Sequence, residues 1–362
     1  MAVFCTYCGR DYPLSGLPYK CSTCGGLFDI KGDQPFSGKL VDPCQPGIWR
    51  YRHTFGLSKG MTPVSIGEGN TPLVWMEAFG RRIAFKCEYC NPTGSFKDRG
   101  SSVITAWLQA RKIKEVVEDS SGNAGASLAA YTALAGIKSK IFVPASASGR
   151  KIRQIETFGA EIQRVSGSRS DVTEKIQKVV ERGAIYASHA YLPFNLPGYA
   201  TAAYEIYEQL GNRMPAGVIV PAGQGGLLLG LARGFDNLRI ADNDLIDIPK
   251  MIGVQTQACA PLWEKYSGNK IGSHERDMQS IAEGVQVNEP VRTDMVLKAI
   301  NECHGSVHVV QEGEIMIGRD ALARLGLFVE PTSAIVWSAL EKNITHLKDP
   351  VVVLLTGSGY KN

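Results

Sequence analysis

The chain has 362 residues, 44% of them hydrophobic and 20% charged, so it can bury a large core and form two or three domains. Its formal net charge of +4 is small and its basic residues are scattered, which argues against a nucleic-acid or anionic-membrane partner and favours a small substrate. The N-terminus has no signal-like apolar stretch, and no apolar run approaches the ~20 residues of a membrane span, so we expect a cytoplasmic protein.

Two CxxC pairs lie near the N-terminus. Cys5 and Cys8 form the first and Cys21 and Cys24 the second, with 12 residues between the pairs and a glycine after each. Glycine permits a tight knuckle whose backbone amides donate to thiolate sulfur atoms, and four thiolates in two knuckles suit a closed tetrahedral site. Nine cysteines in a chain of this size do not indicate a disulfide scaffold. The sequence therefore predicts a zinc ribbon over residues 1–35 that holds a structural Zn²⁺ ion.

The segment 91–100, NPTGSFKDRG, places one lysine where a loop enters a helix. Its Asn, Pro and Gly residues indicate a turn after the apolar run 83–85, and residues 101–108 have helix-compatible apolar spacing. Lys97 would then lie near the positive end of a helix dipole, which disfavours an ammonium and helps to keep an amine free to attack a carbonyl. Position alone would also fit a solvated surface lysine.

Two later loops resemble anion sites. The strand predicted over 115–118 runs into the Ser/Gly/Asn loop 119–123 and then a helix, so unpaired amides and hydroxyls point into one crevice, although a simple capping loop would look the same. The apolar strand 218–221 leads into a glycine-rich turn and a helix that can cradle a phosphate. Its spacing fits neither a dinucleotide nor a Walker fingerprint. The residues of this cradle are Gly223, Gln224, Gly225, Gly226 and Leu227.

Strands and helices alternate between these loops. We predict strands over 140–144, 161–165 and 185–187 with helices over 150–158 and 172–182, which means parallel strands joined by crossovers.

The segment around Lys97 resembles the cofactor-anchoring segment of the threonine synthase family, whose members are fold-type II enzymes that use pyridoxal 5'-phosphate. The resemblance covers nearly the whole chain in order: 67–73 is similar to the GNTPL segment, 119–127 to STGNT and 351–359 to LTGHG. It implies an α/β fold of two doubly wound three-layer domains, of the tryptophan synthase β-like type, behind the zinc ribbon. Residues 92–190 would form a small mobile domain inserted into a large cofactor-binding domain of residues 36–91 and 191–362.

The same resemblance assigns roles to individual residues. Lys97 would anchor pyridoxal 5'-phosphate and act as general base and acid, and Asn123 would bond the phenolic oxygen of the cofactor. Ser120 and Ser121 would hold the substrate carboxylate. Thr356, or Ser358 in its place, would meet the pyridine nitrogen, while the cradle would hold the phosphate. The third CxxC pair, at residues 87–90, has no partner pair, and we interpret its thiols as strand cysteines. Residues 280–284 resemble a segment of the serine/threonine dehydratase branch, and residues 328–334 resemble the EPxSA element of the superfamily. Either segment could serve only in packing, and we favour packing for the second.

Two positions depart from the family pattern. Ala124 replaces the last threonine of STGNT, and Asn195 stands where the family has the arginine that grips the substrate phosphate. A neutral amide cannot give the bidentate charged contact that a phosphate favours, although Arg150, Lys151 or Arg153 could supply the charge.

The sequence therefore leaves two enzyme hypotheses open. The first is a threonine synthase-like lyase that converts O-phosphohomoserine to threonine. The second is a paralogue that performs β-elimination or β-replacement on serine, threonine or O-phosphoserine, of the dehydratase or cysteate synthase type. A zinc-ribbon binding protein with an inert body would require loss of Lys97 or Asn123, and both are present. We expect a homodimer that acts on a small amino acid.

Overall fold

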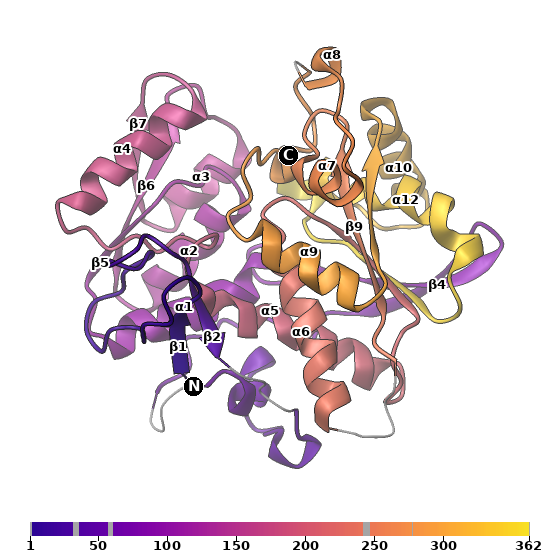
Figure 1. Cartoon of the computed structure of the whole chain (residues 1–362), viewed down its shortest axis with the longest axis horizontal. Helices are drawn as coiled ribbons and strands as arrows, with labels where there is room; N and C mark the ends of the chain where they lie inside the picture. The colour runs from indigo at the N-terminus through magenta and orange to yellow at the C-terminus, as the bar shows by residue number, and fades with distance from the viewer. Residues whose placement is uncertain (1, 32–35, 57–60, 242–246, 277, 362) are drawn as a thin grey trace.

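The computed structural model describes residues 2–31, 36–56, 61–241, 247–276 and 278–361 (Figure 1). Its strands form a six-stranded sheet, a three-stranded sheet and a two-stranded ribbon. The large sheet has the order β10-β9-β8-β11-β4-β3, and only β3 runs antiparallel to its neighbour. The bounds of these strands are β3 (Leu73–Ala78), β4 (Arg81–Lys86), β8 (Gly217–Pro221), β9 (Lys250–Thr256), β10 (Ser306–Val310) and β11 (Val351–Leu354).

The central strands of this sheet are buried on both faces. Val218 and Val220 of β8 join one apolar core, whereas Ile219 between them joins the other, as the two-residue period of a strand requires. The first core contains α5 (Leu196–Gln209), α6 (Gly226–Ala241) and α9 (Thr293–Glu302). The second contains α10 (Glu312–Arg324), the short α11 (Pro331–Ala334) and α12 (Val336–Asn343). Helices on both faces give the predicted three layers.

The small sheet is parallel and has the order β5 (Glu115–Glu118), β6 (Lys138–Pro144) and β7 (Glu161–Val165). One of its faces packs against α1 (Lys97–Ala110), α2 (Asn123–Leu134) and α3 (Arg150–Thr157), and the other against α4 (Arg169–Glu181). The predicted alternation of strands and helices is therefore confirmed. The strand predicted over 185–187 was wrong, because that segment contributes only a single bridge from Tyr186 to Val117 of β5.

The N-terminal ribbon pairs β1 (Ala2–Cys5) with β2 (Phe28–Lys31) in antiparallel register. Val3, Leu17 and Phe28 of the ribbon share the apolar core of the small sheet. The ring of Tyr12 lies 4.5 Å from Phe28 and 5.3 Å from Phe194, so the ribbon is packed onto the body.

The third CxxC pair does not lie in a strand. Residues Glu88–Cys90 form a turn of 3₁₀ helix directly after β4, in which the Cys90 amide donates to the Cys87 carbonyl. The prediction of strand cysteines was therefore wrong. After this turn, Asn91, Pro92 and Gly94 begin the loop that delivers Lys97.

The described chain also contains two short helices, α7 (Pro261–Ser267) and α8 (Ser273–Arg276). Among the described residues, no helix combines the length and the apolar character that crossing a bilayer requires.

Candidate active site

Lys97 is the first residue of α1, as predicted from the loop-to-helix transition. The loop before it is fixed by the buried carboxylate of Asp98, which accepts hydrogen bonds from the Thr93 amide (2.7 Å), the Thr93 hydroxyl (2.6 Å) and the Ser127 hydroxyl (2.6 Å). Burial raises the pKa of Asp98 to about 6, against the opposing effect of these donors. The turn and the helix start are thus held together by one side chain.

The C-terminal loop runs beside the lysine loop, although the two are far apart in sequence. The Phe96 amide donates to the Thr356 carbonyl (3.1 Å), and the Ser358 amide donates to the Gly94 carbonyl (3.0 Å). Thr356 is buried, and its hydroxyl lies 3.1 Å from the hydroxyl of Ser333. The two predicted site residues Lys97 and Thr356 therefore lie on adjoining loops.

Asn123 begins α2 and contacts the segment 328–334. Its Nδ2 atom donates to Oε1 of Glu330 (2.8 Å), and its buried Oδ1 has no hydrogen-bond partner among the described residues. A Cβ atom on Gly357 would lie 2.1 Å from that Glu330 oxygen, so only glycine fits beside the pair. The segment that sequence analysis assigned to packing thus also carries Glu330 and Ser333, which bond to Asn123 and Thr356.

The predicted cradle lies at the start of α6. Gly225 has φ +75°, and a Cβ there would lie 2.5 Å from Cγ2 of Val296, whereas a Cβ on Gly223 would lie 2.7 Å from the Gly284 carbonyl oxygen. Within the described residues, the backbone amides of residues 223–227 donate to no protein acceptor. Free amides at the start of a 16-residue helix fit an anionic group such as a phosphate.

The ring of Tyr199 connects the cradle to the lysine helix. It lies 5.2 Å from the Phe96 ring, and a Cβ added to Gly100 of α1 would be 2.7 Å from it. A Cβ added to Gly226 would be 3.5 Å from the opposite edge of the same ring. The starts of α1 and α6 therefore contact two sides of one buried side chain, which brings the amine and the cradle into one region.

Lys97 is half-buried and lies in a charged environment. Burial lowers the pKa of Lys97 to about 8, with Glu118 and Glu330 opposing that shift and Arg169 adding to it. An amine with this pKa is largely available as a nucleophile or base at slightly alkaline pH.

Glu118 ends β5 directly before the predicted carboxylate loop and pairs with Nδ1 of His189 at 2.9 Å. Burial raises the pKa of Glu118 well above its usual range, and the neighbouring charge of Asp119 acts in the same direction. Burial also lowers the pKa of His189, with help from the charges of Lys97 and Arg169. Burial thus disfavours the charged forms of both side chains.

The predicted substrate residues are placed less favourably for a phosphate. Asn195 is buried, and its Nδ2 atom donates to the His189 carbonyl at 2.5 Å, so one of its two N–H groups is already engaged. Ser120 and Ser121 lie in the loop between β5 and α2, where the Ser120 hydroxyl accepts from the Gly122 amide (3.3 Å). Of the cations considered from sequence, Arg150 donates to the Tyr360 carbonyl (3.1 Å) and Lys151 pairs with Glu330 (3.1 Å).

Sequence reasoning missed Arg169, Glu118 and His189. Arg169 is exposed at the start of α4, and its charge contributes to the pKa shifts of Lys97, Glu118 and His189. The order β5-β6-β7 explains this position, because carboxyl ends of parallel strands meet at one edge and two neighbouring spacings span about 10 Å. Only the pairing of distant strands reveals the group.

A second missed feature is a buried ion cluster around Arg99, two residues after Lys97. Its guanidinium contacts both oxygens of the Glu88 carboxylate and both oxygens of the Glu205 carboxylate at 2.7–2.8 Å. Nζ of Lys86 lies 2.7 Å from Oε2 of Glu205. The cluster also includes Thr71 of the GNTPL-like segment. Arg99, β4 and α5 are thereby joined, which fixes the helix that carries Lys97.

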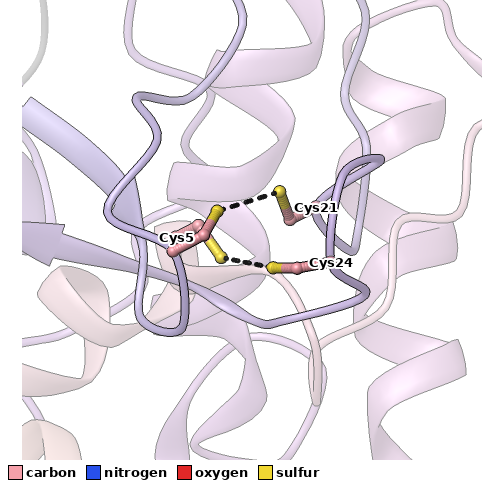
Figure 2. Close-up of side chains that lie close together, drawn as sticks. Cys5, Cys21 and Cys24 are labelled. Atoms are coloured by element: carbon pink, nitrogen blue, oxygen red, sulfur yellow. Dashed lines mark hydrogen bonds between the residues drawn. The ribbon is translucent and has the colours of Figure 1, made fainter.

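The four N-terminal thiols converge (Figure 2). Their sulfur atoms all lie within 4.8 Å of one another, with Cys5 to Cys24 at 3.4 Å and Cys8 to Cys21 at 3.7 Å. A tetrahedral zinc site with bonds of about 2.3 Å needs sulfur pairs about 3.8 Å apart, so the donor set fits such an ion. Backbone amides of Thr23 and Cys24 lower the pKa of Cys21 to about 6, which favours a thiolate.

A hollow of about 770 Å³ lies between α5, α6 and α9 and is lined by residues other than those of the candidate active site. Asp29 and Arg233 line it, but none of the predicted active-site residues does. The size of the hollow therefore does not make it the candidate active site, which we place where the predicted chemical groups converge.

The family described as pyridoxal-phosphate dependent enzymes matches residues 64–357. The chain is 32% identical over 376 aligned positions to a threonine synthase of Methanocaldococcus jannaschii, covering 99% of this chain and 92% of that protein. It is 31% identical to a threonine synthase of Methanosarcina acetivorans, covering 98% and 90%. Among solved structures, a threonine deaminase of T.th. superposes with a TM-score of 0.67 at 24% identity, over 80% of this chain and 92% of that one. A maize serine racemase gives a TM-score of 0.67 at 22% identity, over 79% and 88%.

Proposed function

Because the chain belongs to the family of pyridoxal-phosphate dependent enzymes, we propose that it is a carbon–oxygen lyase of the threonine synthase type, which converts O-phosphohomoserine to threonine. The main support is that Lys97 and Thr356 lie on adjoining loops and that Tyr199 lies between the lysine helix and the glycine cradle, together with full-length similarity to threonine synthases. An amine, a buried hydroxyl and free amides are the three kinds of group that such a cofactor needs.

In this proposal each part of the site has one task. The amides of residues 223–227 hold the cofactor phosphate, Lys97 anchors the aldehyde carbon, and Asn123 bonds the phenolic oxygen. When bound, the cofactor supplies an electron sink that stabilises negative charge on carbon atoms of the substrate. Thr356 would offer the ring nitrogen a hydroxyl rather than a carboxylate, which would leave that nitrogen largely unprotonated and would favour elimination or replacement.

The remaining groups bind substrate and move protons. Ser120 and Ser121 hold the substrate carboxylate at the start of α2. The Lys97 amine, with its pKa lowered to about 8 by burial, takes up a proton from the substrate and returns it at a neighbouring carbon. Arg169 supplies the positive charge for an anionic leaving group, because the side chain of Asn195 carries no charge and its amide nitrogen is engaged by His189.

A second candidate function rests on that same engagement of Asn195. If Arg169 does not reach the leaving group, the site lacks a phosphate grip and instead suits β-elimination or β-replacement on serine, threonine or O-phosphoserine. Ala124, which is buried and offers no hydroxyl, favours this alternative too.

One substrate panel separates the two. Purified protein is given O-phosphohomoserine, serine, threonine, and O-phosphoserine with sulfite, and threonine, phosphate and keto acids are measured. We expect threonine and phosphate from O-phosphohomoserine. In Arg169→Gln we expect the KM for that substrate to rise about tenfold, because the loss of one charged hydrogen bond costs about 1.4 kcal/mol. Turnover of serine without turnover of O-phosphohomoserine would replace the first function by the second.

We further propose that Cys5, Cys8, Cys21 and Cys24 hold one structural Zn²⁺ ion, supported by their convergence. The division into a ribbon of residues 1–35, a small mobile domain of 92–190 and a large domain of the remaining residues stays a prediction. So does the homodimer, which sedimentation analysis would test.

A further inference from the structure

The ribbon is attached by a bidentate ion pair to helix α6, which packs on the large sheet. Oδ1 and Oδ2 of Asp29, in β2, lie 2.8 and 2.7 Å from the two terminal nitrogens of Arg233 in α6. Burial alone would raise the pKa of Asp29, but Arg233 and Arg292 hold it below its usual value. Figure 1 draws β2 beside α6, in agreement with this ion pair.

A second attachment is made by Arg292, a buried residue directly before α9. Its Nη2 atom donates to the Phe28 carbonyl of the ribbon (3.0 Å) and to the Tyr191 carbonyl (2.7 Å). A buried guanidinium needs acceptors for its N–H groups, so loss of the Phe28 carbonyl would leave part of its charge unsatisfied.

Both arginines belong to the elements that shape the phosphate cradle. Arg233 lies two turns after Gly226 on α6, the helix whose first amides form the cradle. Val291, next to Arg292, donates its amide to Oε1 of Gln224 (3.2 Å). Val296 of α9 contacts Gly225 so closely that a Cβ there would lie 2.5 Å away.

These contacts form a path from the cradle to the ribbon, and the path ends at the thiol cluster. Cys5 pairs with Phe28 in the β1–β2 register, and the Thr6 amide donates to the Leu27 carbonyl (2.9 Å). A two-stranded ribbon of this size is marginal by itself, so metal bound by its knuckles would add to the packing of Val3, Leu17 and Phe28 in stabilising it. We therefore expect the positions of Phe28 and Asp29 to respond to the knuckles.

We propose that Asp29, Arg233 and Arg292 are positioning residues that couple the four-thiolate site to the phosphate cradle, so that metal in the ribbon tightens the hold on the cofactor. The inference rests on the proposed cofactor and zinc sites. With the ribbon folded, the starts of α6 and α9 are held in the arrangement that leaves the cradle amides free. Without it, both arginines lose their ribbon partners and the two helix starts loosen.

Thermodynamic linkage makes the coupling reciprocal. If zinc tightens binding of pyridoxal 5'-phosphate by some factor, the cofactor must tighten binding of zinc by the same factor. Coupling of this kind commonly spans about 5- to 150-fold, and we expect about tenfold here.

The test measures two dissociation constants. Pyridoxal 5'-phosphate is titrated by absorbance into zinc-loaded and zinc-stripped protein, and zinc is titrated against a chelating dye with and without the cofactor. In both titrations we expect the dissociation constant to be about tenfold lower when the other ligand is present. Equal cofactor affinity in loaded and stripped protein, with zinc release verified, would overturn the proposal.

Variants test the path while zinc stays bound. Asp29→Asn and Arg292→Met should weaken cofactor binding in zinc-loaded protein and bring the coupling factor towards one. The control is Asp294→Asn, also on α9, which removes the exposed ion pair between Asp294 and Lys265 of α7 (2.6 Å). This variant should change neither the cofactor affinity nor the coupling factor. If the stripped protein unfolds, the zinc-loaded variants decide: wild-type cofactor affinity in both would refute the coupling. Absence of zinc binding would overturn the coupling but leave the proposed function standing, whereas absence of cofactor binding would refute the proposed function itself.

Discussion

Replacement of Arg99 by methionine tests whether the buried ion cluster holds the helix that carries Lys97. Arg99 makes six contacts of 2.7–3.2 Å to Glu88, Glu205, Thr71 and Thr201, and its side chain is fully buried. Methionine keeps much of the volume and removes every donor.

The magnitude follows from the charge balance. The cluster holds two cations, Arg99 and Lys86, against the carboxylates of Glu88 and Glu205, so its net charge is zero. Arg99→Met leaves two carboxylates against one ammonium, which is an uncompensated buried charge. Breaking such a pair costs about 3–5 kcal/mol, a large part of the 5–15 kcal/mol that stabilises an ordinary domain.

The free energy of unfolding is measured by urea titration, after reversibility has been verified. Arg50→Met is the matched control, because Arg50 pairs with Glu208 of the same helix α5 at 2.7 Å while both side chains remain more than a quarter exposed. A pair of this kind contributes about 0–1 kcal/mol. Equal losses in the two variants would refute the reasoning.

The same cluster predicts an acid limit. Burial alone would raise the pKa of Glu205, but Arg99 and Lys86 hold it below its ordinary value of 4.5. A carboxyl with a depressed pKa contributes stability that is present above the unfolded pKa and is lost as pH falls below it. Wild-type protein should therefore lose stability below about pH 4.5 more steeply than Arg99→Met.

Three further predictions concern the cofactor and the metal. Because burial lowers the pKa of Lys97 to about 8, capture of pyridoxal 5'-phosphate by apoenzyme should increase with pH along a curve whose midpoint lies near pH 8. The Lys97→Ala variant should stay colourless. A midpoint near pH 10.5, or a reducible covalent adduct in the variant, would contradict this prediction. Elemental analysis should find about one zinc per chain and much less in Cys21→Ser, since a thiolate ligand is lost; wild-type protein purified without chelators yet lacking zinc would remove the metal site. Gly225→Ala should weaken cofactor binding by about 1–3 kcal/mol more than the control Gly211→Ala does. Both glycines have a positive φ, but only at Gly225 would a Cβ lie 2.5 Å from Val296. Equal cofactor affinities in the two variants would count against the cradle.

Much of the fold could be predicted from sequence because its signals are local. The strand before Gly223 is continuously apolar, and a glycine turn must follow it before α6 can begin. The placement of Lys97 at the start of a helix came from the same local rules, since Pro and Gly end one element and apolar spacing marks the next. The segment 185–187 looked similarly apolar but forms one bridge, because pairing depends on a neighbouring strand rather than on local composition.

The residue types that bind an aldehyde, a phosphate and a metal, together with their order along the chain, were determined by the sequence itself. Which other groups surround them was decided only by tertiary structure. The charge of Arg169 lowers the pKa of Lys97 because β7 and β5 share a sheet, and Glu330 bonds to Asn123 because two distant loops adjoin. Burial, which sets the pKa of Lys97, likewise arises from packing between elements far apart in sequence. The physical reason is that chemistry belongs to side chains, whereas electrostatic environment belongs to the contacts that folding creates.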